Sequence, residues 1–161
     1  MRQPPALGPR GEGWVAIQAV LFAAIGVAGT VVPGHLTGPA ATLAVVAGWI
    51  HVAAGSTLVV AALAGLQAGD ALTAVPRPRD TARLIESGPY RLVRHPIYGG
   101  LVLAAAGWAV MRASLPALLG AAILLVFFDL KRRREEAWLR DRFPGYAAYS
   151  AKTRRMIPWL F

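Results

Sequence analysis

The chain has 161 residues, of which 17 are Lys or Arg, 8 are Asp or Glu and none is Cys. Charged residues make up 16% of the sequence and apolar residues 56%, whereas an ordinary soluble domain has about 25% charged residues. This composition excludes a disordered chain, a disulfide scaffold, a cysteine-ligated zinc site and a cysteine nucleophile. It also argues against a soluble globule, because so few charged side chains cannot cover its surface.

Four stretches of the chain are apolar and suited to span a membrane. The first two, at about 14–32 and 40–66, contain no charged residue and have the roughly 20 residues that a bilayer requires. The next two, at about 96–111 and 113–130, are shorter and borrow flanking residues, with Arg112 reaching the interface. We therefore predict an all-α integral membrane fold with four transmembrane helices. The alternative is a soluble helical bundle, which such helices disfavour because they have almost no polar face.

The basic residues predict the orientation of these helices. Of the 17 Lys and Arg residues, 16 lie in the N-terminal tail, the loop 67–95 and the tail 131–161, on one side of the membrane. Only Arg112 lies on the other side, so the positive-inside rule predicts that both termini are cytoplasmic. The net charge of +9 then reflects topology and attraction to anionic lipids of the bilayer, and no nucleic-acid partner is expected.

The first apolar segment also resembles a signal peptide. It is, however, longer than the apolar region of a typical signal peptide, and it lacks a convincing cleavage site. We expect it to be retained as a helix. The sequence contains no internal repeat and no low-complexity linker. We therefore predict a single membrane domain over 1–161.

A first motif lies before the third apolar segment and reads Gly88-Pro-Tyr-Arg-Leu-Val-Arg-His-Pro-Ile-Tyr-Gly99. Pro96 suits the first turn of a helix, and His95 stands just before it. The N-terminus of a helix favours a carboxylate or phosphate, and Arg94 adds positive charge nearby. Gly99 and Gly100 permit another group to approach the backbone closely. The simpler interpretation is a basic loop next to the membrane with a proline-capped helix.

A second motif, Lys131-Arg-Arg-Arg-Glu-Glu-Ala-Trp-Leu139, continues the fourth apolar segment into the tail. Its basic and acidic residues are four apart, so ordinary ion pairs on a helix surface and a stop-transfer anchor are simple interpretations. Two adjacent carboxylates that face a loop with a histidine and arginines are also suited to hold a cationic ligand. The tail then carries an aromatic turn at 143–149. Its last residues are expected to lie at the membrane interface as an amphipathic flap.

The two motifs together resemble the isoprenylcysteine carboxyl methyltransferase family, whose wider group includes phospholipid N-methyltransferases. The resemblance covers about 76–158. It implies an integral-membrane enzyme that methylates a lipophilic acceptor at the cytoplasmic face with S-adenosyl-L-methionine, leaving S-adenosyl-L-homocysteine. It also implies a cofactor site built from the loop 67–95 and the tail 131–161 rather than from a Rossmann fold. In agreement, no strand followed by Gly-x-Gly-x-x-Gly is found in the sequence. The matching segments are Gly88–Gly99, Glu135–Leu139, Phe143–Tyr149 and Arg154–Pro158.

The resemblance also implies roles for individual residues, and no metal ligand is among them. Lys131 stands where the family has an arginine that contacts the substrate, and a lysine does not form the bidentate fork of an arginine to a carboxylate. Either Arg132 takes over this contact or the acceptor is not a prenylcysteine carboxylate. If the acceptor is an amine, Glu136 or His95 can accept its proton. We therefore expect Lys131, Arg132 and Glu136 as catalytic residues. The implied cofactor residues are Ala82, Arg83, Leu84, Ile85, Tyr90, His95, Pro96, Ile97, Tyr98 and Glu135.

The methyl acceptor stays open at this point, as does the oligomeric state. We expect a carboxylate of the isoprenylcysteine type, with an isoprenoid acid, a phospholipid amine or a small thiol as alternatives. The composition, rich in Ala, Gly and Arg, indicates a prokaryotic gene and therefore an inner cell membrane. Two functions of other classes remain, a non-catalytic membrane scaffold and a small transporter. A transporter requires an ionisable residue at mid-membrane, for which His51 is the candidate.

Overall fold

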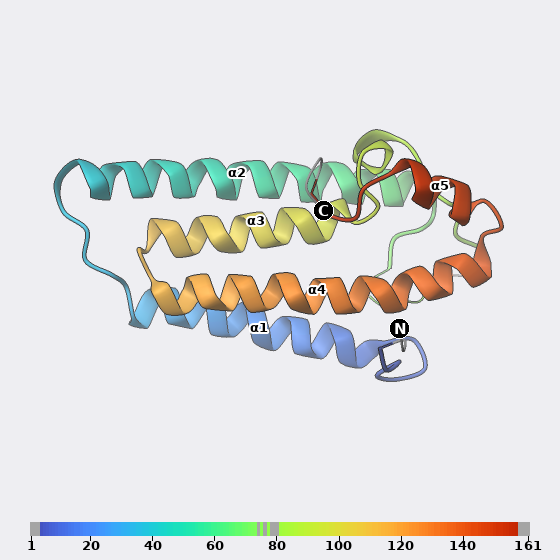
Figure 1. Ribbon diagram of the computed structural model, residues 1–161, viewed down its shortest axis with the longest axis horizontal. Helices are drawn as coiled ribbons and strands as arrows, with labels where there is room; N and C mark the ends of the chain where they lie inside the picture. Colours follow the sequence, from blue (N-terminus) through green and yellow to red (C-terminus); the bar gives the residue numbers. More distant parts are fainter. Residues whose placement is uncertain (1–3, 74, 76, 78–80, 158–161) are drawn as a thin grey trace.

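The computed structural model describes residues 4–73, 75, 77 and 81–157 of the chain (Figure 1). The regular elements in these ranges are helices, and one isolated bridge joins Val93 to Arg154. The predicted all-α fold is thus confirmed, while the end of the expected interfacial flap, at 158–161, lies outside the described residues. The elements are α1 (Glu12–Val31), α2 (Gly38–Ala68), the 3₁₀ turn η1 (Gly88–Arg91), α3 (Pro96–Met111), α4 (Leu115–Arg142) and α5 (Tyr146–Lys152).

The four long helices run alternately up and down, and both basic segments lie at one end of the bundle (Figure 1). α2 packs on α3, α3 on α4, and α4 on α1. The start of α1, the end of α2, the start of α3 and the end of α4 all lie at the end of the bundle that carries α5 (Figure 1). The opposite end carries only the short connections 32–37 and 112–114. The two sequence motifs, about 40 residues apart, are therefore brought together at the same end.

Two of the four predicted spans have the length and composition needed to cross a bilayer, namely α1 and α2. Only 17% of the most apolar stretch of α1 and 11% of that of α2 are buried within the chain. The core helix of a soluble protein is mostly buried, so these two helices present apolar side chains to their surroundings instead. α3 is also apolar but has 16 residues, which is short for a span.

α4 is longer than its predicted apolar part because the charged motif continues it without a break. It begins after the N-cap Ser114, whose hydroxyl accepts a hydrogen bond from Ala117 N at 3.4 Å and donates one to Val32 O at 2.7 Å. Its 28 residues correspond to about 42 Å at 1.5 Å per residue. This extends beyond a hydrocarbon core of about 30 Å. The polar second half of α4 therefore carries Lys131 and Glu135 to the end of the bundle.

Glycines fix how closely α3 approaches α2. A Cβ atom on Gly55 would lie 2.4 Å from the carbonyl oxygen of Gly100, and one on Gly107 would lie 2.7 Å from that of Gly48. Both pairs are seven residues apart on their helices, so they follow one seam of the contact. Small residues of this kind let helix backbones pack closely in membranes. The seam therefore sets the position of α3, whose first turn carries the candidate site.

Candidate active site

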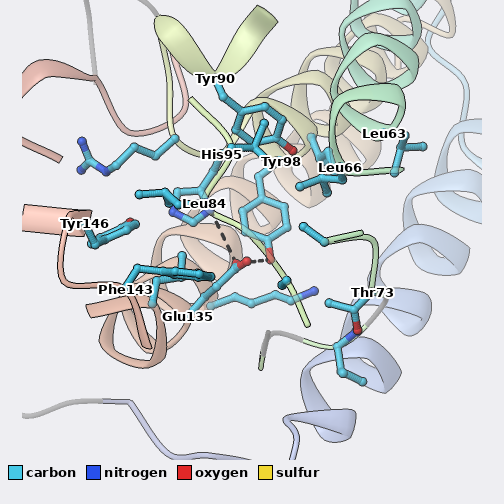
Figure 2. Close-up of a pocket in the computed structure, with 18 of the residues that line it drawn as sticks. Leu63, Leu66, Thr73, Leu84, Tyr90, His95, Tyr98, Glu135, Phe143 and Tyr146 are labelled. Atoms are coloured by element: carbon cyan, nitrogen blue, oxygen red, sulfur yellow. Dashed lines mark hydrogen bonds and ion pairs between the residues drawn. The ribbon is translucent and has the colours of Figure 1, made fainter. Parts of the chain in front are cut away.

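A cavity of about 280 Å³ lies at the end of the bundle where the two motifs meet (Figure 2). This volume is just below the range of about 300–1,000 Å³ for small-molecule sites. Every residue that the resemblance implied for the cofactor lines it except Pro96, which is buried in the first turn of α3. Lys131 lines it too. The predicted residues in the lining are Ala82, Arg83, Leu84, Ile85, Tyr90, His95, Ile97, Tyr98, Lys131 and Glu135.

The tail crosses the start of α3 and holds the first motif in place. The amide of His95 donates to Arg155 O at 2.9 Å, and the amide of Arg94 donates to Arg154 O at 2.9 Å. A Cβ atom on Gly99 would lie 2.4 Å from Met156 O. The expected close approach at this glycine is thus confirmed, and the group that approaches is the backbone of the tail. The tail therefore covers the start of α3, and no local pattern in the sequence connects these two segments.

An aromatic stack carries His95 and positions Glu135. The ring of His95 stacks on Tyr98 with centroids 5.3 Å apart, and Tyr98 stacks on Phe128 at 4.5 Å. The Tyr98 hydroxyl donates to Glu135 Oε2 at 2.7 Å, and His95 Nδ1 lies 3.6 Å from the same oxygen (Figure 2). The side chain of Glu135 is still 24% exposed, so its carboxylate is fixed in direction but accessible from the cavity.

Glu136 points to the other side of His95 and is surrounded by cationic groups. Its Oε1 accepts from Arg94 Nε at 3.1 Å and lies 3.2 Å from His95 Nε2, while Oε2 accepts from Arg140 Nη2 at 3.0 Å. Burial alone raises the pKa of this carboxyl, but the hydrogen bond from His95 and the charge of Arg94 outweigh it and lower the pKa to about 2. Glu136 is therefore a permanent anion that binds His95 and Arg94 in position.

Arg132 and Glu136, both expected at the reacting centre, lie outside the lining of the cavity. Arg132 donates from Nε to Asp129 Oδ1 at 2.8 Å and lies 3.6 Å from Glu136. The Arg132–Glu136 pair suggested by their spacing of four is thus formed. Because one helix face turns Lys131 and Glu135 toward the cavity, the next residues on the helix point behind it. Arg132 and Glu136 thus contact neighbouring side chains behind the cavity, namely Asp129 and His95.

Lys131 does not form the corresponding pair with Glu135. Its ammonium donates to Gln18 Oε1 on α1 at 2.6 Å and lies 5.2 Å from the centre of the Tyr98 ring. The residue is only 3% exposed, and burial lowers its pKa although the charge of Glu135 acts in the opposite direction. Lys131 is thus a buried cation on the wall of the cavity.

Several lining residues were not assigned from the sequence. The aromatic turn at 143–149 is recognisable in the sequence, and its spacing is the signal that could assign Tyr146 and Tyr149 to the site. The apolar residues of α1, α2 and α3 carry no local signal, because they look like any membrane-helix residue. The additional lining residues are Val15, Gln18, Leu63, Leu66, Ala71, Thr73, Val75, Arg94, Leu101, Leu139, Phe143, Tyr146 and Tyr149.

Tyr146 has the features of a ligand contact. Its side chain is 1% exposed and lines the cavity, yet its hydroxyl has no hydrogen-bond partner within the described part of the chain. Burial and the nearby Glu136 carboxylate raise the pKa of this hydroxyl well above its usual range, so it stays a neutral donor. An unpaired buried hydroxyl costs about 1–3 kcal/mol. A polar atom of a bound ligand would relieve this cost.

Two apolar helices of membrane length, and a cavity with acidic, basic and aromatic side chains, define a helical protein of membrane type with a small-molecule site at one end of its bundle. The chain belongs to the phospholipid methyltransferase family, whose model matches residues 43–145, more than half of its length. The matched range includes most of α2, all of α3 and both sequence motifs, Gly88–Gly99 and Lys131–Leu139. The resemblance stated from the sequence is confirmed, since this family is membrane-bound and includes isoprenylcysteine methyltransferases.

The curated relatives include two methyltransferases by name and one protein with a different name. The chain is 35% identical over 106 residues to proteins of Oryza sativa subsp. indica and subsp. japonica named "Probable protein-S-isoprenylcysteine O-methyltransferase", over 63% of this chain and 56% of theirs. It is 36% identical over 84 residues to "Cobalt-zinc-cadmium resistance protein CzcN" of Cupriavidus metallidurans, over 51% of this chain and 38% of that protein. The chain thus spans about half or less of the length of these relatives.

Proposed function

We propose that the protein transfers a methyl group from S-adenosylmethionine to a lipophilic acceptor at the cytoplasmic face of a prokaryotic inner membrane, as a multi-pass protein with both termini cytoplasmic. The observation that carries this proposal is the composition of one cavity. Its polar wall comes from the two motifs, and its apolar wall comes from Leu63, Leu66 and Leu101 of the membrane-type helices. Leu63 is also 37% exposed, so the apolar wall reaches the surface of the bundle.

The side chains of the polar wall suit the cofactor. Glu135 accepts the Tyr98 hydroxyl with one oxygen and retains acceptor capacity for the ammonium of the amino-acid moiety. The rings of Tyr90 and Tyr98 offer faces for the adenine or the sulfonium. The unpaired hydroxyl of Tyr146 offers one further donor. These residues fit S-adenosylmethionine, which when bound supplies an electrophilic methyl group on a sulfonium.

The remaining residues of the site orient the reactants and exclude water. Glu136 and Arg94 hold His95 against Tyr98, and Tyr98 in turn directs Glu135 into the cavity. The tail over Gly99 shields the start of α3 from water. Methyl transfer to an ionised acceptor needs in-line positioning rather than a general base. We therefore assign Glu136 a positioning role and place the acceptor beside Lys131.

A carboxylate is the acceptor that the cavity favours. Lys131 is a buried ammonium on the wall and forms no ion pair with a carboxylate in the described ranges. Such a site attracts an anionic head group and disfavours the ammonium form of a phospholipid amine. A prenylated cysteine and an isoprenoid acid both have this chemistry.

The direct test is methyl transfer from labelled S-adenosylmethionine to an extract of native membranes, followed by identification of the labelled product. We expect a lipophilic methyl ester, which mild base hydrolyses to release labelled methanol. A labelled product that resists base would show an amine or thioether and overturn the carboxylate acceptor. No labelled lipid with folded protein would favour a scaffold.

The transporter alternative rests on His51, which lies outside the lining of the cavity. The residue is exposed on α2, and its Nδ1 donates to Ala47 O on the preceding turn at 2.7 Å. We expect His51→Ala to leave methyl transfer unchanged and His95→Ala to reduce it. The reverse pattern would support transport.

A further inference from the structure

α1 contributes a polar side chain to the cavity although it precedes the residues matched by the family model. Gln18 lies in an apolar stretch of this helix and lines the cavity together with Val15, three residues earlier on the same face. A glutamine directed inward from a membrane-type helix is costly unless its amide is paired. Its partner is Lys131, 113 residues further along the chain.

The contact fixes how the amide of Gln18 is oriented. An ammonium group has three donors and no acceptor, so the amide oxygen must be the atom that faces Lys131 at 2.6 Å. With its oxygen engaged, the amide presents its NH₂ group as the remaining polar group. Gln18 and Lys131 thus place an amide NH₂ group and an ammonium group next to each other, and both can donate to the same ligand.

The ammonium of Lys131 is itself incompletely paired. One donor goes to Gln18, and the rings of Tyr98 and Phe128 cover one side of the group at 5.2 and 5.9 Å. Glu135 lies one helical turn away, but its Oε2 accepts from Tyr98. Glu135 attracts the ammonium but forms no ion pair with it, and a buried charge without an ion pair is unfavourable. An anion that enters the cavity beside Lys131 would remove this imbalance.

We propose that Gln18 and Lys131 together form the subsite for a carboxylate head group. Lys131 donates to one carboxylate oxygen, and the Gln18 amide supplies the second N–H donor, because a lysine alone cannot bind both oxygens as an arginine does. The pair replaces a bidentate arginine by two residues from different helices. The acceptor is then a lipophilic acid whose hydrocarbon part lies along Val15, Leu63 and Leu66. This inference rests on the proposed function and names its substrate class.

The reaction at this subsite balances without a proton acceptor. A carboxylate oxygen forms a bond to the methyl carbon, and the bond between that carbon and the sulfonium sulfur breaks. Its electron pair stays on sulfur, which becomes neutral, and the products are a methyl ester and S-adenosylhomocysteine. Gln18 and Lys131 hold the carboxylate while the charge of both reactants disappears.

The decisive variant is Gln18→Glu, tested on the full chain in detergent with N-acetyl-S-farnesyl-L-cysteine as the probe. Glutamate keeps the contact with Lys131 and adds an ion pair, but it removes both N–H donors and repels a carboxylate. We expect the KM for the probe to rise at least roughly ten-fold, as the loss of a hydrogen bond to a charged group predicts. Binding of S-adenosylhomocysteine stays within about two-fold. A purely structural contact between α1 and α4 would leave the KM unchanged, which would overturn the proposal.

Rescue provides a second and independent test. Gln18→Leu should raise the KM for the probe by a similar factor with kcat little changed. Adding Lys131→Arg should restore most of the lost affinity, because an arginine supplies both donors alone. Failure of this rescue in a protein that still binds S-adenosylhomocysteine would contradict the shared subsite. The matched control is Gln67→Glu, which adds the same charge on an exposed position of α2 outside the cavity lining.

Failure of this inference and failure of the proposed function give different results. If the unmodified protein does not bind S-adenosylhomocysteine, the methyltransferase function itself is wrong. If it binds the product and methylates phosphatidylethanolamine vesicles but not the farnesylated probe, methyl transfer stands and the carboxylate subsite is overturned.

Discussion

Removing the Tyr146 hydroxyl should have opposite effects on the stability of the protein and on its affinity for the ligand. Because this buried group has no partner in the described chain, Tyr146→Phe removes an unsatisfied polar atom rather than a hydrogen bond. An unpaired buried hydroxyl costs about 1–3 kcal/mol, so the variant should unfold at the same temperature as the unmodified protein or at a higher one. Binding should weaken, because the ligand loses the donor that completes its contacts.

The expected loss of binding follows from the worth of one neutral hydrogen bond. A net contribution of about 0.5–1.5 kcal/mol corresponds to a dissociation constant for S-adenosylhomocysteine that is roughly two- to twelve-fold higher. Isothermal titration calorimetry measures this constant, and differential scanning fluorimetry in the same detergent measures the unfolding temperature.

Tyr149→Phe is the matched control, since it removes the same atom from the same short helix. The Tyr149 hydroxyl donates to Tyr90 O at 2.9 Å, and the side chain is 5% exposed. Its loss should destabilise the protein by about 1 kcal/mol or more, which is roughly 2–4 °C for a chain of this size. If Tyr146→Phe lowers the unfolding temperature as much as Tyr149→Phe and leaves binding unchanged, the assignment of Tyr146 as a ligand contact is wrong.

Three further predictions concern charge and packing. Glu135→Gln keeps an acceptor for the Tyr98 hydroxyl but loses the negative charge. Calorimetry should therefore show that S-adenosylhomocysteine binds roughly ten-fold or more weakly, with little change in the unfolding temperature. Unchanged binding would show that Glu135 does not belong to the site. The pKa of Glu136 is lowered from 4.5 to about 2 on folding, so its stabilisation of about 3 kcal/mol is complete above pH 4.5 and is lost as the pH falls toward 2. Glu136→Gln should therefore reduce the difference in unfolding temperature between pH 6 and pH 3, and an unaltered difference would contradict this linkage. Gly55→Ala places a Cβ atom 2.4 Å from Gly100 O and should lower the free energy of unfolding by about 1–3 kcal/mol. The control Gly26→Ala should not destabilise the protein, because a Cβ atom there meets nothing within 4 Å. Equal unfolding temperatures of the two variants would refute the close contact of α2 and α3.

The sequence predicted the helices and most of the cofactor lining because local patterns carry that information. Apolar stretches gave the helices, and the proline after His95 gave the start of α3 within one residue. Residues that follow one another in the first motif reach the cavity together because the start of a helix and the loop before it are adjacent in space.

The sequence did not predict which face of α4 is turned toward the cavity. Lys131 with Glu135, and Arg132 with Glu136, have identical spacing in the sequence. Only the packing of α4 against α1 and α3 turns the first pair toward the cavity. The same packing directs Glu136 toward His95, while Arg132 binds Asp129 on its own helix. For this reason two of the three residues expected at the reacting centre lie outside the lining.

Contacts between distant segments were also beyond the reach of the sequence. Gln18 and Lys131 are separated by 113 residues, and nothing in α1 marks one glutamine as a partner of the fourth helix. Likewise, the pairing of the tail with the residues before α3 depends on backbone groups, which every residue except proline carries in the same form.

The central claim is that the cavity binds the methyl donor of the reaction. Titration of S-adenosylhomocysteine into the purified, folded chain tests it most directly. We expect one site per chain, with binding weakened roughly ten-fold or more by Glu135→Gln and unaffected by His51→Ala. Absence of binding by the folded, unmodified protein would contradict the claim.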